Sequence, residues 1–168
     1  IMSNNNKVKN AKRTSLGDVK FRSKLEKNCY IQLKKAGLDF KYEAIKFVLW
    51  EGFRPENITL VNNFYSTGKR TKKKFNKYEK VLCKDLYKDN SKIGNITYTP
   101  DFIVKRDKVY IIIETKGNPN DVFPYKKKMF LKYLEEIDTD YKFVYMELRN
   151  NGQIKDAIEL IKKGEFDA

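Results

Sequence analysis

Two acidic residues and a lysine interrupt the otherwise apolar stretch TYTPDFIVKRDKVYIIIETKG, at residues 97–117. They are Asp101, Glu114 and Lys116. Carboxylates held close together repel one another unless a cation lies between them, and Mg²⁺ prefers carboxylate oxygens as ligands. A lysine beside such a metal is suited to orient a water or to stabilise the charge that develops on a phosphate. These residue types therefore indicate metal-dependent hydrolysis of phosphodiesters.

The apolar residues around the charges predict a β-hairpin that brings them together. A tight turn at Asp107 and Lys108 places Asp101 directly opposite Glu114, where Cβ atoms are about 4.5–5.5 Å apart. Because side chains alternate along a strand, Asp101, Glu114 and Lys116 are expected on one face. The other face is then apolar, with Phe102, Val104, Val109, Ile111 and Ile113. An ion-pair cluster that ends a sheet is the alternative interpretation of the same charges.

Charge and composition narrow the classes of partner and chemistry. The chain has 36 Lys and Arg against 22 Asp and Glu, a net charge of +14, which favours a polyanionic partner. We expect nucleic acid rather than a membrane surface, because no long apolar span is present. The absence of histidine excludes Ser-His and Cys-His catalysis and His-containing metal sites. Cys29 and Cys83 show no CxxC spacing, so neither a zinc site nor a disulfide framework is indicated, and a reducing cytoplasm fits. We expect no small-molecule cofactor.

The order of predicted elements indicates an α/β (α+β) fold with a central mixed sheet flanked by helices. Residues 1–14 form a polar, basic arm, and residues 15–168 form a single domain that contains an insertion at 51–96. Apolar periodicity predicts helices and strands in the following order: a helix from Phe21 to Ala36 ended by Gly37, a strand at 38–50, the hairpin at 97–117, a helix at 125–136, a strand at 141–148 and a helix at 153–164.

The hairpin motif resembles that of the PD-(D/E)xK nuclease superfamily, with Pro100, Asp101, Glu114 and Lys116 at the motif positions. The blocks KFRSKLEKNCYIQLKKAGLDFKYE, TYTPDF and ETKG are similar to the bacteriophage endonuclease I family, the Holliday junction resolving enzymes of podoviruses. The resemblance covers residues 20–43 and 97–117, under half of the chain. It implies a restriction-endonuclease-like core and a homodimer that cuts branched DNA.

By this resemblance Asp101, Glu114 and the Thr115 carbonyl would bind Mg²⁺, for which Mn²⁺ would substitute. Lys116 would be the catalytic lysine, and Glu26 would be an additional carboxylate supplied by the first helix. The spacing of Ser23 and Glu26 also matches a capping box, in which the acid completes the start of the helix.

Glu43 matches a further position of the family, although a solvent-facing strand residue explains it equally well.

Basic residues outside the hairpin are candidate phosphate contacts. They are Arg22, Lys72, Lys73, Lys74, Lys126, Lys127 and Lys128. Solvated helix faces and exposed loops are the alternative interpretation of these lysines. Two other functions also remain open. One is a site-specific endonuclease, of the homing or restriction type, that reads base edges with its insertion. The other is a basic nucleic-acid-binding protein without catalysis.

Overall fold

The computed structural model describes residues 13–57, 60–62, 86–88, 91–117 and 122–166. The chain divides into two compact units, of which the first combines Ile1–Leu49 with Thr97–Ala168 and the second is Trp50–Ile96. The bounds of the second unit differ by one residue from residues 51–96. Its strands β5 (Leu60–Asn62) and β6 (Leu86–Lys88) pair antiparallel. Most of the predicted arm, Cys83 and the three lysines at 72–74 lie outside the described residues.

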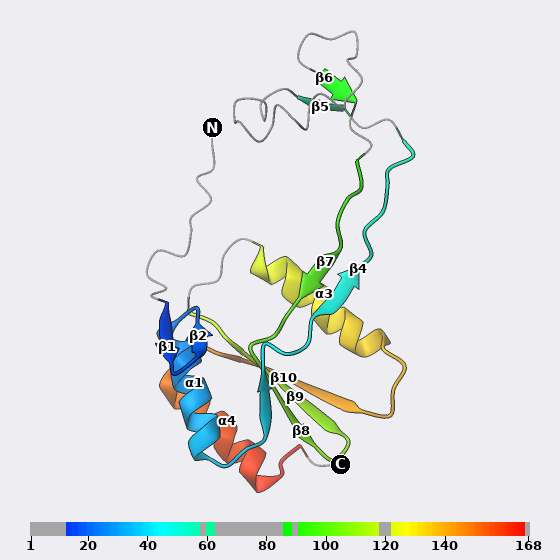
Figure 1. Cartoon of the computed structure of the whole chain (residues 1–168). Helices are drawn as coiled ribbons and strands as arrows, with labels where there is room; N and C mark the ends of the chain where they lie inside the picture. Colours follow the sequence, from blue (N-terminus) through cyan, green and yellow to red (C-terminus); the bar gives the residue numbers. More distant parts are fainter. Residues whose placement is uncertain (1–12, 58–59, 63–85, 89–90, 118–121, 167–168) are drawn as a thin grey trace. The chain divides into compact units, whose positions relative to one another are not determined.

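A four-stranded mixed sheet forms the centre of the first unit, in the order β10-β9-β8-β3 (Figure 1). Its strands are β3 (Phe40–Tyr42), β8 (Phe102–Arg106), β9 (Val109–Thr115) and β10 (Lys142–Leu148). β10 runs parallel to β9, whereas β8 is antiparallel to both β9 and β3. The prediction of a mixed sheet flanked by helices is therefore confirmed.

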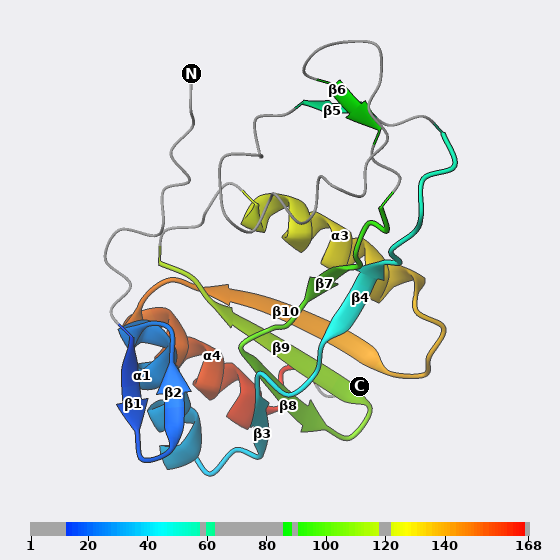
Figure 2. The same cartoon turned by 45° about the horizontal axis from the view of Figure 1, so that its top comes forward.

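Three helices cover the two faces of this sheet. Helices α1 (Lys24–Lys35) and α4 (Asn151–Lys163) pack on one face, and α3 (Phe123–Glu136) packs on the other (Figure 2). The first face buries a core that includes Cys29, Leu33, Phe102, Ile111, Ile113 and Ile154. The second buries Tyr98, Ile112, Phe123 and Phe130. In the described part of the chain, no helix combines the length and the apolar character needed to cross a membrane.

The predicted hairpin register is confirmed between β8 and β9. Phe102 lies opposite Ile113 and Arg106 lies opposite Val109, with the turn between them. Asp107 adopts a left-handed conformation (φ 45°) there, which aspartate tolerates better than most residues. The hairpin is shorter than predicted, because Tyr98 belongs to a separate strand, β7 (Ile96–Tyr98), which pairs with β4 (Phe47–Trp50).

The single strand predicted at 38–50 is wrong, since β3 and β4 belong to different sheets. The chain breaks at Glu43, which has a φ of 43° and therefore cannot continue an extended strand. The Glu43 amide donates to the Asp101 carbonyl at 2.9 Å. This bond ties the end of β3 to the residue that precedes β8.

The start of the first helix also differs from the prediction. Phe21 ends a short hairpin of β1 (Thr14–Leu16) and β2 (Val19–Phe21), and α1 begins only at Lys24. Ser23 is the reason, because its side chain accepts a hydrogen bond from the Glu26 amide and caps the helix. At the other end, Gly37 takes a left-handed φ of 71° and ends the helix as predicted.

Candidate functional site

Asp101 lies between Pro100 and the first residue of β8, with only 8% of its surface exposed. Its Oδ2 accepts two hydrogen bonds from Thr115, one from the backbone amide at 2.8 Å and one from the hydroxyl at 2.6 Å. These bonds hold the carboxylate against the end of β9. Two uncharged donors satisfy one oxygen, and no lysine or arginine of the described residues bonds to this carboxylate.

Glu26 closes the capping box of α1 and is 2% exposed. Its Oε2 accepts from the amides of Arg22 at 2.6 Å and Ser23 at 3.1 Å, and its Oε1 accepts from the Tyr42 hydroxyl at 2.9 Å. The structural interpretation of this acid is therefore confirmed. It does not exclude a second role, because each carboxylate oxygen has two lone pairs.

Three carboxylates meet beside the end of β3. Each of Glu26, Glu43 and Asp101 has an oxygen within 4.8 Å of an oxygen of the other two. Arg22 approaches this group from outside, with Nη2 at 2.7 Å from Glu43 Oε1 and with 75% of its side chain exposed. The sequence did not place Glu43 in a site, because the left-handed turn that redirects it has no glycine or asparagine to mark it.

The electrostatic state of Asp101 reflects this crowding. Burial, together with the nearby carboxylates of Glu114 and Glu26, raises the pKa of Asp101 to about 7 against the lowering effect of the Thr115 hydrogen bonds. A carboxylate in this condition is ionised only with difficulty near neutral pH. A bound cation would remove that difficulty, and oxygen donors are the ligands that Mg²⁺ and Mn²⁺ accept.

Glu114 and Lys116 share one face of the sheet, as the alternation of side chains predicts. Lys116 Nζ lies 3.0 Å from Glu114 Oε1 and 4.2 Å from the centre of the Phe123 ring. The Tyr98 hydroxyl donates to Glu114 Oε2 at 2.8 Å. Asp101 does not join them on that face, since its carboxylate bonds to Thr115.

Glu114 lies outside the group of three carboxylates, although its charge is close enough to raise the pKa of Asp101.

The lysines of α3 that were candidate phosphate contacts differ in their surroundings. Lys126 Nζ donates to the Thr97 carbonyl at 3.0 Å, and Lys127 Nζ contacts Glu147 Oε2 at 2.6 Å. Lys128 is exposed. A phosphate at Lys126 or Lys127 would have to compete with these internal acceptors, so Lys128 is the most accessible of the three.

Sequence reasoning missed Glu147, which lies beside Glu114 in the parallel register of β10 and β9. Arg149 Nη2 also contacts it, at 2.6 Å from Oε1. The order of the strands places Glu147 beside Glu114, and no pattern within residues 141–148 indicates that order.

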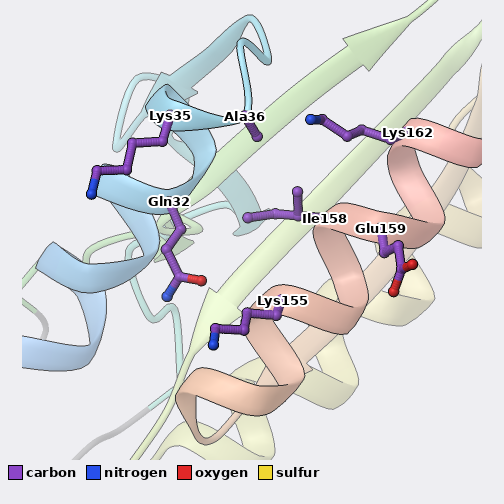
Figure 3. Close-up of a pocket in the computed structure, with 7 residues that line it drawn as sticks. All are labelled: Gln32, Lys35, Ala36, Lys155, Ile158, Glu159 and Lys162. Atoms are coloured by element: carbon purple, nitrogen blue, oxygen red, sulfur yellow. The ribbon is translucent and has the colours of Figure 1, made fainter.

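Two other features lie apart from these acids. A pocket of about 360 Å³ lies between α1 and α4, and its walls include Lys35, Lys155 and Lys162 (Figure 3). None of the predicted site residues lines it. Cys29, on α1, is fully buried, and burial raises the pKa of its thiol to about 12, which makes it unreactive.

The chain matches no protein-family model, no curated protein and no solved structure. Its likeness to the PD-(D/E)xK nucleases therefore rests on the motif residues of the sequence alone.

Proposed function

We propose that this protein is a metal-dependent endonuclease that hydrolyses phosphodiester bonds of DNA. The observation that carries the proposal is the burial of Asp101 among other carboxylates without a basic side chain bonded to it in the described residues. A buried ionised carboxylate is costly unless it is paired or coordinates a metal. Because no basic side chain of the described residues bonds to Asp101, we take a bound cation as its partner.

The donors around Asp101 fit a hard divalent cation. Asp101 would hold it with the nearest oxygens of Glu26 and Glu43, and the motif adds Glu114 and the Thr115 carbonyl as further candidates. Mg²⁺ or Mn²⁺ at such a site lowers the pKa of a bound water and neutralises charge on a phosphate. The group consists of a residue of α1, the residue that follows β3 and the residue that precedes β8, so the packing of α1 on the sheet helps to position the three carboxylates.

Lys116, held by Glu114, would contact the phosphate or the attacking water. Lys116 keeps its ammonium group between Glu114 and the face of Phe123, with 27% of the side chain exposed. An ammonium group held in this way can donate to a phosphate oxygen or to the attacking water without first being desolvated. Tyr98 fixes the orientation of Glu114, and burial together with the Glu114 charge raises the pKa of the Tyr98 hydroxyl, so that it stays a donor.

The net charge of +14 supports DNA as the substrate, because phosphate neutralisation drives binding. The sequence blocks shared with the endonuclease I family support branched DNA and a homodimer. A site-specific endonuclease on the same chemistry is the nearest rival, and a binding protein without catalysis is the rival outside enzymes.

One assay separates these functions. The purified chain is incubated with a four-way junction, a linear duplex and a single strand in Mg²⁺ or Mn²⁺, beside the Asp101→Asn variant. We expect cleavage of the junction by the wild type and none by the variant, with DNA binding retained in both. Equal cutting of junction and linear duplex would remove junction selectivity. If the wild type cuts none of these DNAs, the proposal that the protein is a nuclease is wrong.

A further inference from the structure

An exposed pair of aromatic side chains distinguishes the second unit, Trp50–Ile96. Trp50 and Phe53 are 50% and 43% exposed, and their ring centres lie 5.5 Å apart with an interplanar angle of 51°. Ile93, on the returning segment of the same unit, is 42% exposed. Large apolar side chains gathered at the surface usually mark a binding site.

The backbone beneath these side chains is held in place by close contacts. The Ile93 amide donates to the Phe53 carbonyl at 2.7 Å, and the Gly52 amide donates to Asn95 Oδ1 at 2.8 Å. A Cβ atom on Gly52 would meet the Ile93 carbonyl oxygen at 2.3 Å, so only glycine permits this approach. The segment that carries both aromatic side chains is therefore joined to the returning segment at residues 93–95.

The charge of the unit indicates which partner meets these rings. Residues 50–96 contain 11 Lys and Arg and 5 Asp and Glu, a net charge of +6. A polyanion is attracted to such a unit, whereas a basic or neutral apolar protein surface is not. Unpaired nucleobases combine an anionic backbone with flat π faces, and aromatic side chains bind them by stacking.

We propose that Trp50 and Phe53 form a stacking site for unpaired bases of DNA. In a continuous duplex both faces of each base are already stacked, so the site selects DNA with single-stranded or opened segments. This inference rests on the proposed function for the choice of DNA, and it adds a substrate class to that function: DNA that contains unpaired bases.

Trp50 is the chain's sole tryptophan, so intrinsic tryptophan fluorescence reports on this site alone. Wild-type protein is titrated in EDTA with a single-stranded oligothymidylate and, separately, with a duplex of equal length. We expect saturable quenching by the single strand and much weaker quenching by the duplex. Equal quenching by both, or none by the single strand, would overturn the proposal. So would an emission shift that depends only on protein concentration, since a second copy of the chain would then cover the pair.

Variants give an independent measurement. The affinity for a labelled single strand, followed by anisotropy, should fall about 10-fold in Trp50→Ala and in Phe53→Ala and be restored in Trp50→Phe. Leu160→Ala, which removes an equally exposed apolar side chain from α4, should leave the affinity unchanged. Unchanged affinity in both aromatic variants would contradict the stacking site.

The two proposals fail separately. Quenching without any metal-dependent cleavage would overturn the nuclease and leave the stacking site standing. Cleavage without quenching would overturn the stacking site and leave the nuclease standing.

Discussion

Asp101 and Glu147 are two acidic residues of the first unit with little exposed surface, and their pKa values are shifted in opposite directions. The Glu147 side chain is 10% exposed, and it is bound by Lys127 and Arg149, whose hydrogen bonds and charges hold its pKa below the usual range. Asp101 is 8% exposed, and burial together with the Glu114 charge raises its pKa to about 7. The two acids differ because burial is the leading cause of the shift at Asp101, whereas the hydrogen bonds and charges of Lys127 and Arg149 outweigh the effect of burial at Glu147. Glu147 forms ion pairs with two basic side chains, whereas no basic side chain of the described residues bonds to Asp101.

The largest expected effect is on cleavage, and it should separate these two acids. Asp101→Asn keeps the shape of the side chain but removes the charge that would hold the metal. We expect cleavage to fall by more than about 100-fold, since even groups that only support a metal ligand cost up to that much. The rate of cleavage of a labelled four-way junction in Mg²⁺ measures the loss.

Glu147→Gln is the matched control for Asp101→Asn, because it removes one negative charge from the same sheet. Its rate should stay within about 3-fold of the wild type, since its partners are charged side chains of the protein. Equal losses in the two variants would contradict the distinction between them.

The second effect is on stability as a function of pH. The folded pKa of Asp101 is about 7, above its ordinary value of 3.8, so the folded state holds this proton more tightly than the unfolded state. The resulting stabilisation is complete below about pH 4 and is lost as the pH rises through about 7. Without metal, the free energy of unfolding should fall over this range by a few kcal/mol more in the wild type than in Asp101→Asn. Urea unfolding at pH 5 and pH 8 in EDTA measures it.

Mg²⁺ should reverse that loss. We expect it to stabilise the wild type more at pH 8 than at pH 5 and to leave Asp101→Asn almost unaffected. Parallel pH curves for the two proteins in EDTA would show that Asp101 is not the group responsible.

A smaller effect concerns the ion pair on the other acid. Glu147→Gln should lower the free energy of unfolding by about 1–2 kcal/mol, because it weakens charged hydrogen bonds to Lys127 and Arg149. Denaturation in low and high salt measures this cost, which should shrink as salt is added. A salt-independent cost would indicate lost packing instead.

The smallest expected effect separates the two roles of the α1 terminus. Ser23→Ala removes the side-chain acceptor for the Glu26 amide and should cost about 1 kcal/mol of stability, with cleavage retained. Glu26→Gln keeps an acceptor for the cap but should reduce cleavage strongly. Thermal unfolding and the junction assay, applied to both variants, test the division. Loss of cleavage in Ser23→Ala to the extent seen in Glu26→Gln would mean that the cap alone explains Glu26.

The hairpin was predictable from sequence because its apolar alternation and its turn determine one register. The register of Phe102 with Ile113, and hence the approach of Asp101 to the end of β9, follows from local pattern alone. The capping box of α1 was also predictable, because it depends only on Ser23 and Glu26, three residues apart in the sequence.

The remainder of the site depends on contacts between distant segments. Glu43 reaches Asp101 because the chain turns left-handed after β3, at a residue with no sequence signature for such a turn. Glu147 acquires Lys127 as a partner only because α3 packs on the face of the sheet that includes β10. A side chain such as Lys127 looks like a solvated helix residue until that packing is known.

Binding of Mn²⁺ to the chain, followed by isothermal titration calorimetry in the absence of DNA, tests the central claim most directly. The wild type and Glu147→Gln should each show saturable binding with the same affinity, and Asp101→Asn should show none at the same concentrations. If Mn²⁺ binds Asp101→Asn as tightly as the wild type, or binds neither protein, the carboxylates around Asp101 are not a metal site.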